Sequence, residues 1–350
     1  MRRVPLVIAI ALLAGACSGT TTPTPPPPPV EDPPKITCPA PQTAPLITGT
    51  STIVSYPAPI TTNGRAPVTV ACTPASGSPF SVGQTTVTCT ATDGLQRTNA
   101  CSFAVTVTPL PTLTVTRFVS FGDSITAGED GIDGGPDTSF LCVPKVTTTS
   151  QFQPHVILPD AQTYPGQLQA KLSATYQTQS PSVLKRGCPG ESVAPATSPS
   201  ATRQRFDALV STGQFDVVLI MEGSNDLDAI VWSDPVGAAA AALRSLVGDA
   251  KSVGTKPMLA TIPPMNPNGR RGSGASLVTS LNDRIRQVAA VENVPLVDVY
   301  AAFNGNLTLL GADGLHPNAG GYTVIAGAFF DAIKSTFEKT SPSALTFRRR

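Results

Sequence analysis

The chain has 350 residues, enough for one large domain or for two ordinary domains joined by linkers. Its 24 lysines and arginines nearly balance 23 aspartates and glutamates, which removes any electrostatic case for binding nucleic acid. Hydrophobic residues make up 41%, which permits a full core, and only 13% of the residues are charged. The two histidines, His155 and His316, are too few for a multi-histidine metal site, so we expect no metal and no organic cofactor.

The first 17 residues look like a bacterial signal peptide. A basic start precedes an apolar run from Val4 to Ala14, which is too short to span a bilayer as a lone anchor. Small residues then lead to Cys17, as in a lipobox, where the cysteine becomes lipidated. We therefore expect an exported protein, attached through Cys17 to the cell surface or outer membrane as a lipoprotein. The alternative is cleavage by ordinary signal peptidase and free secretion.

Two segments of different composition follow the signal peptide. Residues 18–35 are rich in proline, which predicts an extended linker without a core. Residues 36–109 contain short alternating runs separated by turn clusters, and this pattern predicts a small all-β sandwich. The expected strands are 52–56, 68–72, 85–92 and 102–108.

The β-rich segment closely resembles the hyalin-repeat (HYR) family of immunoglobulin-like modules. The resemblance is carried by Cys38-Pro39, Cys72-Thr73-Pro74, the run from Ser76 to Gly83, the run from Val87 to Asp93, and Cys101-Ser102-Phe103. It implies an extracellular adhesion or spacer module without catalytic residues. Such a module is a candidate for contact with a polysaccharide or another surface partner.

The cysteines support an oxidising compartment. Without Cys17 six remain, an even number, and none has the spacing of a metal site. The four in the module allow three pairings, of which we favour Cys38–Cys101 with Cys72–Cys89.

After an expected linker at 110–116, residues 117–338 alternate between strand and helix patterns. Strands are expected at 114–121, 216–221, 257–262 and 295–300, and helices at 164–176, 236–253, 276–292 and 319–337. This alternation predicts a parallel sheet with helices on both faces. The tail, 339–350, is expected to be disordered.

The strongest chemical signal is Gly122-Asp123-Ser124-Ile125, which follows a strand directly and so puts Ser124 at the carboxyl edge of the sheet. Alone, a serine there is usually a helix N-cap. Three more blocks follow in order: Gly187-Cys188-Pro189-Gly190-Glu191-Ser192, Gly223-Ser224-Asn225-Asp226, and Asp313-Gly314-Leu315-His316-Pro317. Together the four blocks make residues 117–338 look like an SGNH (GDSL-type) hydrolase. The resemblance implies a three-layer α/β/α sandwich that cleaves carboxylic esters through an acyl-serine intermediate.

The spacing of the last block assigns the catalytic roles. Ser124 needs a base to lose its proton, and in Asp-x-x-His the carboxylate of Asp313 can reach the ring of His316 and orient it. A structural histidine is the alternative role for His316. His155 is expected in a loop, without such a partner. The resemblance assigns the oxyanion hole to the backbone N–H groups of Ser124 and Gly190 and the side-chain amide of Asn225.

The sequence departs from the family in three places. Lys185 stands where the second block usually has an asparagine, and residues 129–163 form a long insertion. Cys142 lies in that insertion and Cys188 in the second block, so we expect a disulfide that fixes the insertion beside the oxyanion hole. Two separate buried thiols are the alternative.

Two classes of function remain open from the sequence. The first is an exported serine hydrolase, either an esterase or lipase or a carbohydrate O-acetylesterase. The second is a non-catalytic surface adhesion protein that works through the HYR module. The intact set of site residues favours the enzyme.

Overall fold

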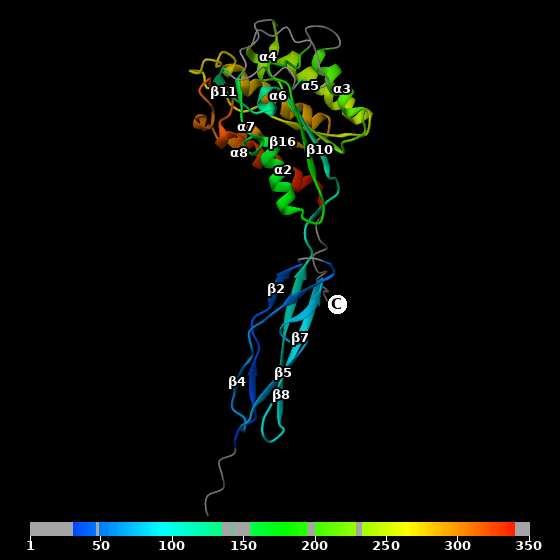
Figure 1. The fold of residues 1–350 in the computed structure, drawn as a ribbon, viewed down its shortest axis with the longest axis vertical. Coiled ribbons are helices and arrows are strands. Elements are labelled where there is room, and N and C mark those ends of the chain that lie inside the picture. Colours follow the sequence, from blue (N-terminus) through cyan, green and yellow to red (C-terminus); the bar gives the residue numbers. More distant parts are fainter. Residues whose placement is uncertain are drawn as a thin grey trace, which may run out of the picture. The chain divides into compact units, whose positions relative to one another are not determined.

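The structure is a computed structural model that describes residues 31–46, 49–134, 142, 155–194, 200–228 and 233–339. It divides into two compact units, one made mostly of residues before Val107 and the other mostly of residues after it (Figure 1). The expected signal peptide with Cys17, residues 18–30 of the expected linker and residues 340–350 of the tail lie outside the described residues. In the part of the chain that is described, no helix is both long and apolar enough to cross a membrane.

The N-terminal module is built from β-strands alone in its described residues. Its strands are β1 (Lys35–Thr37), β2 (Gln42–Pro45), β3 (Ser51–Val54), β4 (Ile60–Thr62), β5 (Thr69–Thr73), β6 (Ser78–Ser81), β7 (Gly83–Thr92) and β8 (Thr98–Thr108). One sheet has the order β2-β8-β7-β5, and β1-β4 and β3-β6 form two further pairs. Alternate side chains of β7 and β8 are buried, which gives each strand one face for the core.

Two disulfides hold the module together. Cys38 is bonded to Cys101, and Cys72 to Cys89. Cys72 and Cys89 stand directly opposite each other in the antiparallel register of β5 and β7. This is the pairing that we favoured from the sequence.

The second unit is an α/β domain with a five-stranded parallel sheet, in the order β13-β10-β14-β15-β16. The sheet strands are β10 (Arg117–Gly122), β13 (Ser182–Gly187), β14 (Val217–Met221), β15 (Lys256–Ala260) and β16 (Leu296–Val297). Shorter strands form two antiparallel pairs, β9 (Thr112–Leu113) with β17 (Glu338–Lys339) and β11 (Glu129–Asp133) with β12 (His155–Ile157). The helices are α1 (Ser124–Ala127), α2 (Tyr164–Thr175), α3 (Ala201–Val210), α4 (Ser224–Asp228), α5 (Pro235–Ser252), α6 (Val278–Val291), α7 (Val299–Phe303) and α8 (Ala319–Phe337).

Both faces of the sheet are covered, which explains the continuous apolar run of β14. Val217, Leu219 and Met221 belong to a core that includes residues of α2 and α8. Val218 and Ile220 belong to a second core with residues of α3, α5 and α6. Successive side chains of a strand point to opposite faces, so the domain has three layers, α/β/α, as expected.

Three expectations about element bounds need correction. The strand expected at 295–300 ends at Val297, because the Asp298 side chain accepts a hydrogen bond from Ala301 N and starts α7. The expected linker 110–116 contains β9, whose Leu113 is buried in the core of the α/β domain. Its partner β17 includes Lys339, the first residue of the expected tail.

Candidate active site

The site lies where three parallel strands end side by side. Gly122, the last residue of β10, is opposite Gly187 of β13 and Met221 of β14. A Cβ at Gly122 would collide with Thr126 and the backbone of Met221, so this close approach requires glycine. Asp123 caps α1 by accepting a hydrogen bond from Ile125 N at 2.9 Å. Ser124 is therefore the first residue of a short helix at the carboxyl edge of the sheet.

The structure brings Ser124, His316 and Asp313 into one hydrogen-bonded chain. Ser124 Oγ is 2.8 Å from His316 Nε2, and His316 Nδ1 is 2.6 Å from Asp313 Oδ2. All three side chains are buried. Such a chain orients the imidazole so that Nε2 faces the serine hydroxyl.

The second carboxylate oxygen of Asp313, Oδ1, is also hydrogen-bonded. It accepts hydrogen bonds from the backbone N–H groups of Leu315 and His316, each at 3.0 Å. Burial alone would raise the pKa of Asp313, but the hydrogen bond and charge of His316 and these two backbone N–H groups hold it well below its usual range. The carboxylate is therefore kept ionised beside the ring.

His155 does have a partner, which corrects the sequence-based expectation. It lies in β12, is 5% exposed, and its Nδ1 is 2.8 Å from Glu129 Oε2. The pairing of β11 with β12 brings the two residues together. Glu129 Oε2 is also 3.4 Å from His316 Nε2, so His155 and Glu129 lie beside the proposed catalytic base. Sequence reasoning missed this contact because the two residues are 26 positions apart and belong to no motif.

The second and third blocks follow the two strands that flank β10, and they contact each other. Gly190 has φ of 72°, a left-handed conformation that favours glycine. Asn225 Nδ2 donates to the carbonyl oxygen of Glu191 at 2.8 Å, and Asn225 Oδ1 accepts from Arg271 at 3.1 Å. These bonds fix the orientation of the amide, whose nitrogen carries a second N–H group.

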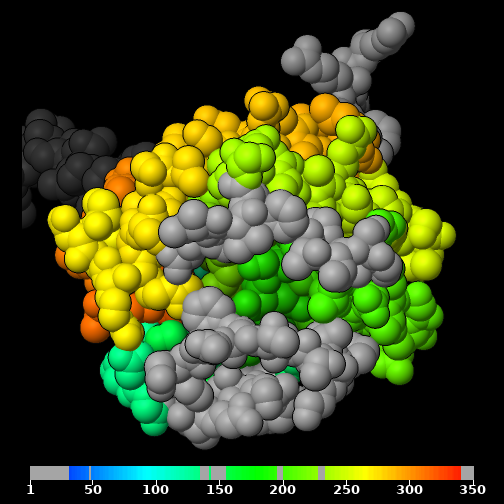
Figure 2. Space-filling view, turned by 90° about the horizontal axis from the view of Figure 1, so that it is seen from above, coloured from blue at the N-terminus to red at the C-terminus, as the bar shows by residue number. Residues whose placement is uncertain are grey.

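The segment 187–194 is further tied to the sheet and to α4. Cys188 N donates to Gly122 O at 2.8 Å. The carboxylate of Asp226 accepts from Val193 N at 3.0 Å and from Ala194 N at 2.7 Å. Figure 2 shows the domain from above, with green residues from the middle of the chain near the centre of the view. The turn that carries Gly190 is thus held by several independent bonds.

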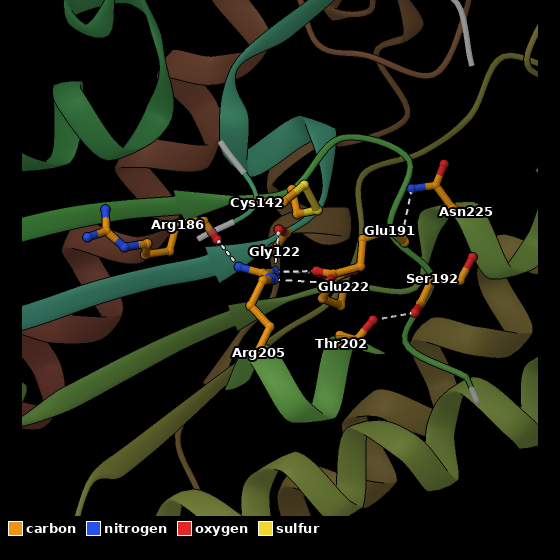
Figure 3. The surroundings of a disulfide bond; sticks show 10 residues. Gly122, Cys142, Arg186, Glu191, Ser192, Thr202, Arg205, Glu222 and Asn225 are labelled. Carbon is orange, nitrogen blue, oxygen red and sulfur yellow. Dashed lines mark hydrogen bonds and ion pairs between the residues drawn. A yellow bond between two sulfur atoms is a disulfide. The ribbon is translucent and has the colours of Figure 1, made fainter. Parts of the chain in front are cut away.

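A buried ion cluster lies behind this turn (Figure 3). Arg205 of α3 is 1% exposed and binds both carboxylate oxygens of Glu191, with its Nε 2.9 Å from Oε1. Its guanidinium carbon lies 3.9 Å from the centre of the Phe121 ring, on which it stacks. It also donates to Gly122 O and Arg186 O. Burial, then the negative charges of Glu191 and Asp123, raise the pKa of Glu222 well above its usual value. No motif predicted Arg205, although Glu191 and Glu222 lie in or beside recognised blocks.

The third disulfide joins the insertion to the same turn. Cys142 is bonded to Cys188, the pair expected from the sequence (Figure 3). Of the insertion's other residues, 135–141 and 143–154 lie outside the described residues. Lys185, which replaces the family's asparagine, forms an ion pair with Asp160 at 2.5 Å.

Two sequence-family models match the chain. A sequence model of the GDSL-like lipase/acylhydrolase family matches residues 120–324, and a model of the HYR domain matches residues 31–107. No curated protein matches the chain. Among solved structures, a lipase/acylhydrolase from Enterococcus faecalis is 21% identical with a TM-score of 0.49, covering 65% of this chain and 99% of its own.

Two further solved structures are similar. A carbohydrate acetylesterase from Sinorhizobium meliloti is 23% identical with a TM-score of 0.46, covering 62% of this chain and 98% of its own. An aryl esterase from M. smegmatis is 18% identical with a TM-score of 0.48, covering 63% of this chain and 99% of its own. The family match itself spans more than half of the 350 residues and contains all four motif blocks. The chain therefore belongs to the GDSL-like lipase/acylhydrolase family and is an ester hydrolase of the SGNH type that carries a HYR domain.

Proposed function

We propose that the protein cleaves carboxylic esters through an acyl-serine intermediate, with Ser124 as nucleophile, His316 as base and Asp313 as the residue that orients the base. The observation that carries the proposal is the hydrogen-bonded chain from Ser124 Oγ through His316 to Asp313, at 2.8 and 2.6 Å. Its position at the carboxyl edge of a parallel sheet is where such folds bind ligands.

The reaction follows from these contacts. His316 Nε2 takes the hydroxyl proton while Ser124 Oγ attacks the ester carbonyl carbon, and Asp313 stabilises the imidazolium. His316 then gives the proton to the departing alkoxide, which leaves an acyl ester on Ser124. In the second half, His316 deprotonates a water molecule that attacks the acyl ester, and it then returns this proton to Ser124 Oγ as the acid is released.

The negative charge on the former carbonyl oxygen needs donors. We assign these to the backbone N–H groups of Ser124 and Gly190 and to Asn225 Nδ2. The bonds from Asn225 to Glu191 O and from Arg271 to Asn225 support this assignment, because they hold the amide in place before the reaction. Each such donor lowers the barrier by about 3 kcal/mol.

The test is turnover of a short-chain nitrophenyl ester together with labelling by a serine-directed phosphonate. Ser124→Ala and His316→Ala should each abolish turnover, and the phosphonate should label Ser124. Ser245→Ala, which changes a partly exposed serine on α5, is the matched control and should keep full activity. Turnover that survives Ser124→Ala would overturn the mechanism and favour the alternative of a non-catalytic adhesion protein.

We further propose that the protein is exported, either anchored through a lipid on Cys17 or secreted, and that the HYR module contacts a polysaccharide or another surface partner. The three disulfides support an oxidising compartment. Metabolic labelling with palmitate should mark the wild-type chain and not Cys17→Ala. An unlabelled wild-type chain in the culture medium would instead indicate free secretion.

The acyl group is the open part of the substrate. Acetylated polysaccharides, lipid esters and small aryl esters remain the candidate classes. Turnover measured on esters of increasing acyl chain length and on acetylated glycans separates these classes, because an enzyme for each class is fastest on a different one of these substrates.

A further inference from the structure

Both histidines of the chain meet at one carboxylate. Glu129 Oε2 is 2.8 Å from His155 Nδ1 and 3.4 Å from His316 Nε2, and the two imidazole rings lie 4.9 Å apart between centroids. All three residues are at most 5% exposed. The acyl-serine mechanism uses His316 but gives no part to Glu129 or His155.

The three ligand atoms have the spacing of a zinc site. They all lie within 4.8 Å of one another, and the described residues contain no other such group of three histidine, cysteine or acidic side chains. Tetrahedral Zn²⁺ holds nitrogen and oxygen at about 2.0–2.2 Å, which places neighbouring ligand atoms about 3.4 Å apart. The separation of Glu129 and His316, 3.4 Å, has this value, and that of Glu129 and His155, 2.8 Å, is shorter, so these two side chains must move apart to hold the ion.

The outer partners of the two histidines have the pattern of a metal site as well. His316 Nδ1 is 2.6 Å from Asp313, and His155 Nε2 is 3.4 Å from Asp133. Each ring therefore presents one nitrogen toward Glu129 and has a carboxylate facing the other. A metal-binding histidine almost always donates its second N–H group to such a partner.

The local charge also favours a dication. Three carboxylates, on Glu129, Asp133 and Asp313, face the two rings, and of these Asp133 is paired with Arg270 at 2.6 Å. Two imidazoles with one carboxylate suit Zn²⁺ and related transition metals, whereas Mg²⁺ and Ca²⁺ prefer oxygen ligands alone.

We propose that Glu129, His155 and His316 form an inhibitory site for Zn²⁺. The lone pair of His316 Nε2 must accept the proton of Ser124, so a metal ion on that nitrogen stops turnover. Removal of the ion restores the hydrogen bond between Ser124 and His316, which makes the inhibition reversible. The scarcity of histidines argued against a multi-histidine site, but two histidines with one glutamate are a sufficient ligand set.

The first test measures binding without activity. Zn²⁺ is titrated calorimetrically into Ser124→Ala, which retains all three ligands. Adding Glu129→Gln or His155→Gln should weaken Zn²⁺ binding by more than the ~10–100-fold that an outer partner is worth. Asp133→Asn should weaken Zn²⁺ binding by about 10-fold. Because the side chain of Asp133 is 50% exposed, this variant still tests the proposal if a buried substitution disturbs folding.

The matched control is Glu292→Gln, which changes a glutamate paired with Arg244 and Lys251. It should leave the Zn²⁺ affinity unchanged, and near-ultraviolet circular dichroism verifies the fold of each variant. Equal affinity in Ser124→Ala and in all folded variants would show adventitious surface binding and overturn the proposal.

The second test measures inhibition of the wild-type enzyme. Buffered Zn²⁺ should stop turnover of a nitrophenyl ester, a chelator should restore it, and Mg²⁺ and Ca²⁺ at equal concentration should have no effect. Inhibition by all three ions alike, or inhibition that a chelator does not reverse, would also overturn the proposal. Absence of turnover in the metal-free enzyme would refute the esterase mechanism, but it would leave the calorimetric result on Zn²⁺ binding unchanged.

Discussion

Asp123, the residue before Ser124, makes the stability of the domain depend on pH. Its side chain is 1% exposed and caps α1 through the bond to Ile125 N. Burial raises its pKa to about 7, and this outweighs the lowering by that backbone bond. Asp123 therefore caps the helix with a carboxyl group that ionises only near neutral pH.

The first prediction concerns Asp123→Asn. The folded pKa of about 7 lies above the unfolded value of about 4, so the folded state binds the proton more tightly and stability is lost as pH rises between these values. Asparagine keeps the capping oxygen without the charge. The free energy of unfolding, measured with denaturant from pH 5 to pH 8, should therefore decrease less in the variant than in the wild type.

Asp283→Asn, at an exposed ion pair with Arg286, is the control for this comparison and should reproduce the wild-type slope. Asp226, whose burial raises its pKa to about 6, contributes with the same sign, so some slope should remain in Asp123→Asn. An unchanged slope in Asp123→Asn would contradict the raised pKa.

Helix α3 contributes the cation that stabilises the turn 187–194, and this gives the second prediction. Arg205→Met removes the buried partner of Glu191 and Glu222, and a broken buried pair costs about 3–5 kcal/mol. Arg203→Met, two positions earlier on the same helix, removes a pair with Asp249 that is only partly buried, and this should cost about 0–1 kcal/mol. Denaturant unfolding measures both; equal losses would show that the buried cluster has no special weight.

The disulfide between the insertion and the same turn gives the third prediction. The bond between Cys142 and Cys188 spans 46 residues, for which chain entropy gives about 4 kcal/mol as an upper value. The strands of the sheet do not depend on it, so its reduction should disorder the neighbourhood of Gly190 first. Turnover should then fall at lower reductant concentrations than the near-ultraviolet circular dichroism signal does.

The other disulfides provide the control for that titration. The double variant Cys72→Ala, Cys89→Ala lacks a bond of the HYR module and should keep wild-type turnover before reduction. Unchanged turnover after selective reduction of Cys142–Cys188 would leave the bond a purely structural role.

The sequence predicts the elements and residues that follow local rules. The four blocks could be placed because each follows a strand end or uses a short spacing, as Asp313 and His316 do. The contact between Glu129 and His155 could not be predicted, because it depends on the register of β11 and β12 within a long insertion. Arg205 was missed for a related reason: a charged residue on a helix is usually exposed, and only the three-dimensional packing places it against Phe121.

For the whole molecule, the division of labour between the two units is the remaining question. Every residue that we assign to catalysis lies after Val107, in the α/β domain. The N-terminal limit of that domain is set by β9, because Leu113 is buried in its core and β9 pairs with β17. A shortened chain must therefore begin before Thr112.

The fourth prediction is that residues 108–350 alone hydrolyse small nitrophenyl esters with the kcat/KM of the full chain, since no site residue is removed. On an insoluble acetylated polysaccharide the full chain should be faster if the HYR module binds that polymer, because a second binding site raises the local concentration of substrate. Adding the separate module should not restore this advantage, since the gain depends on the covalent link. Loss of small-ester turnover in the folded shortened chain would instead mean that the module completes the active site. Equal rates on the polymer would mean that its partner is something other than the substrate.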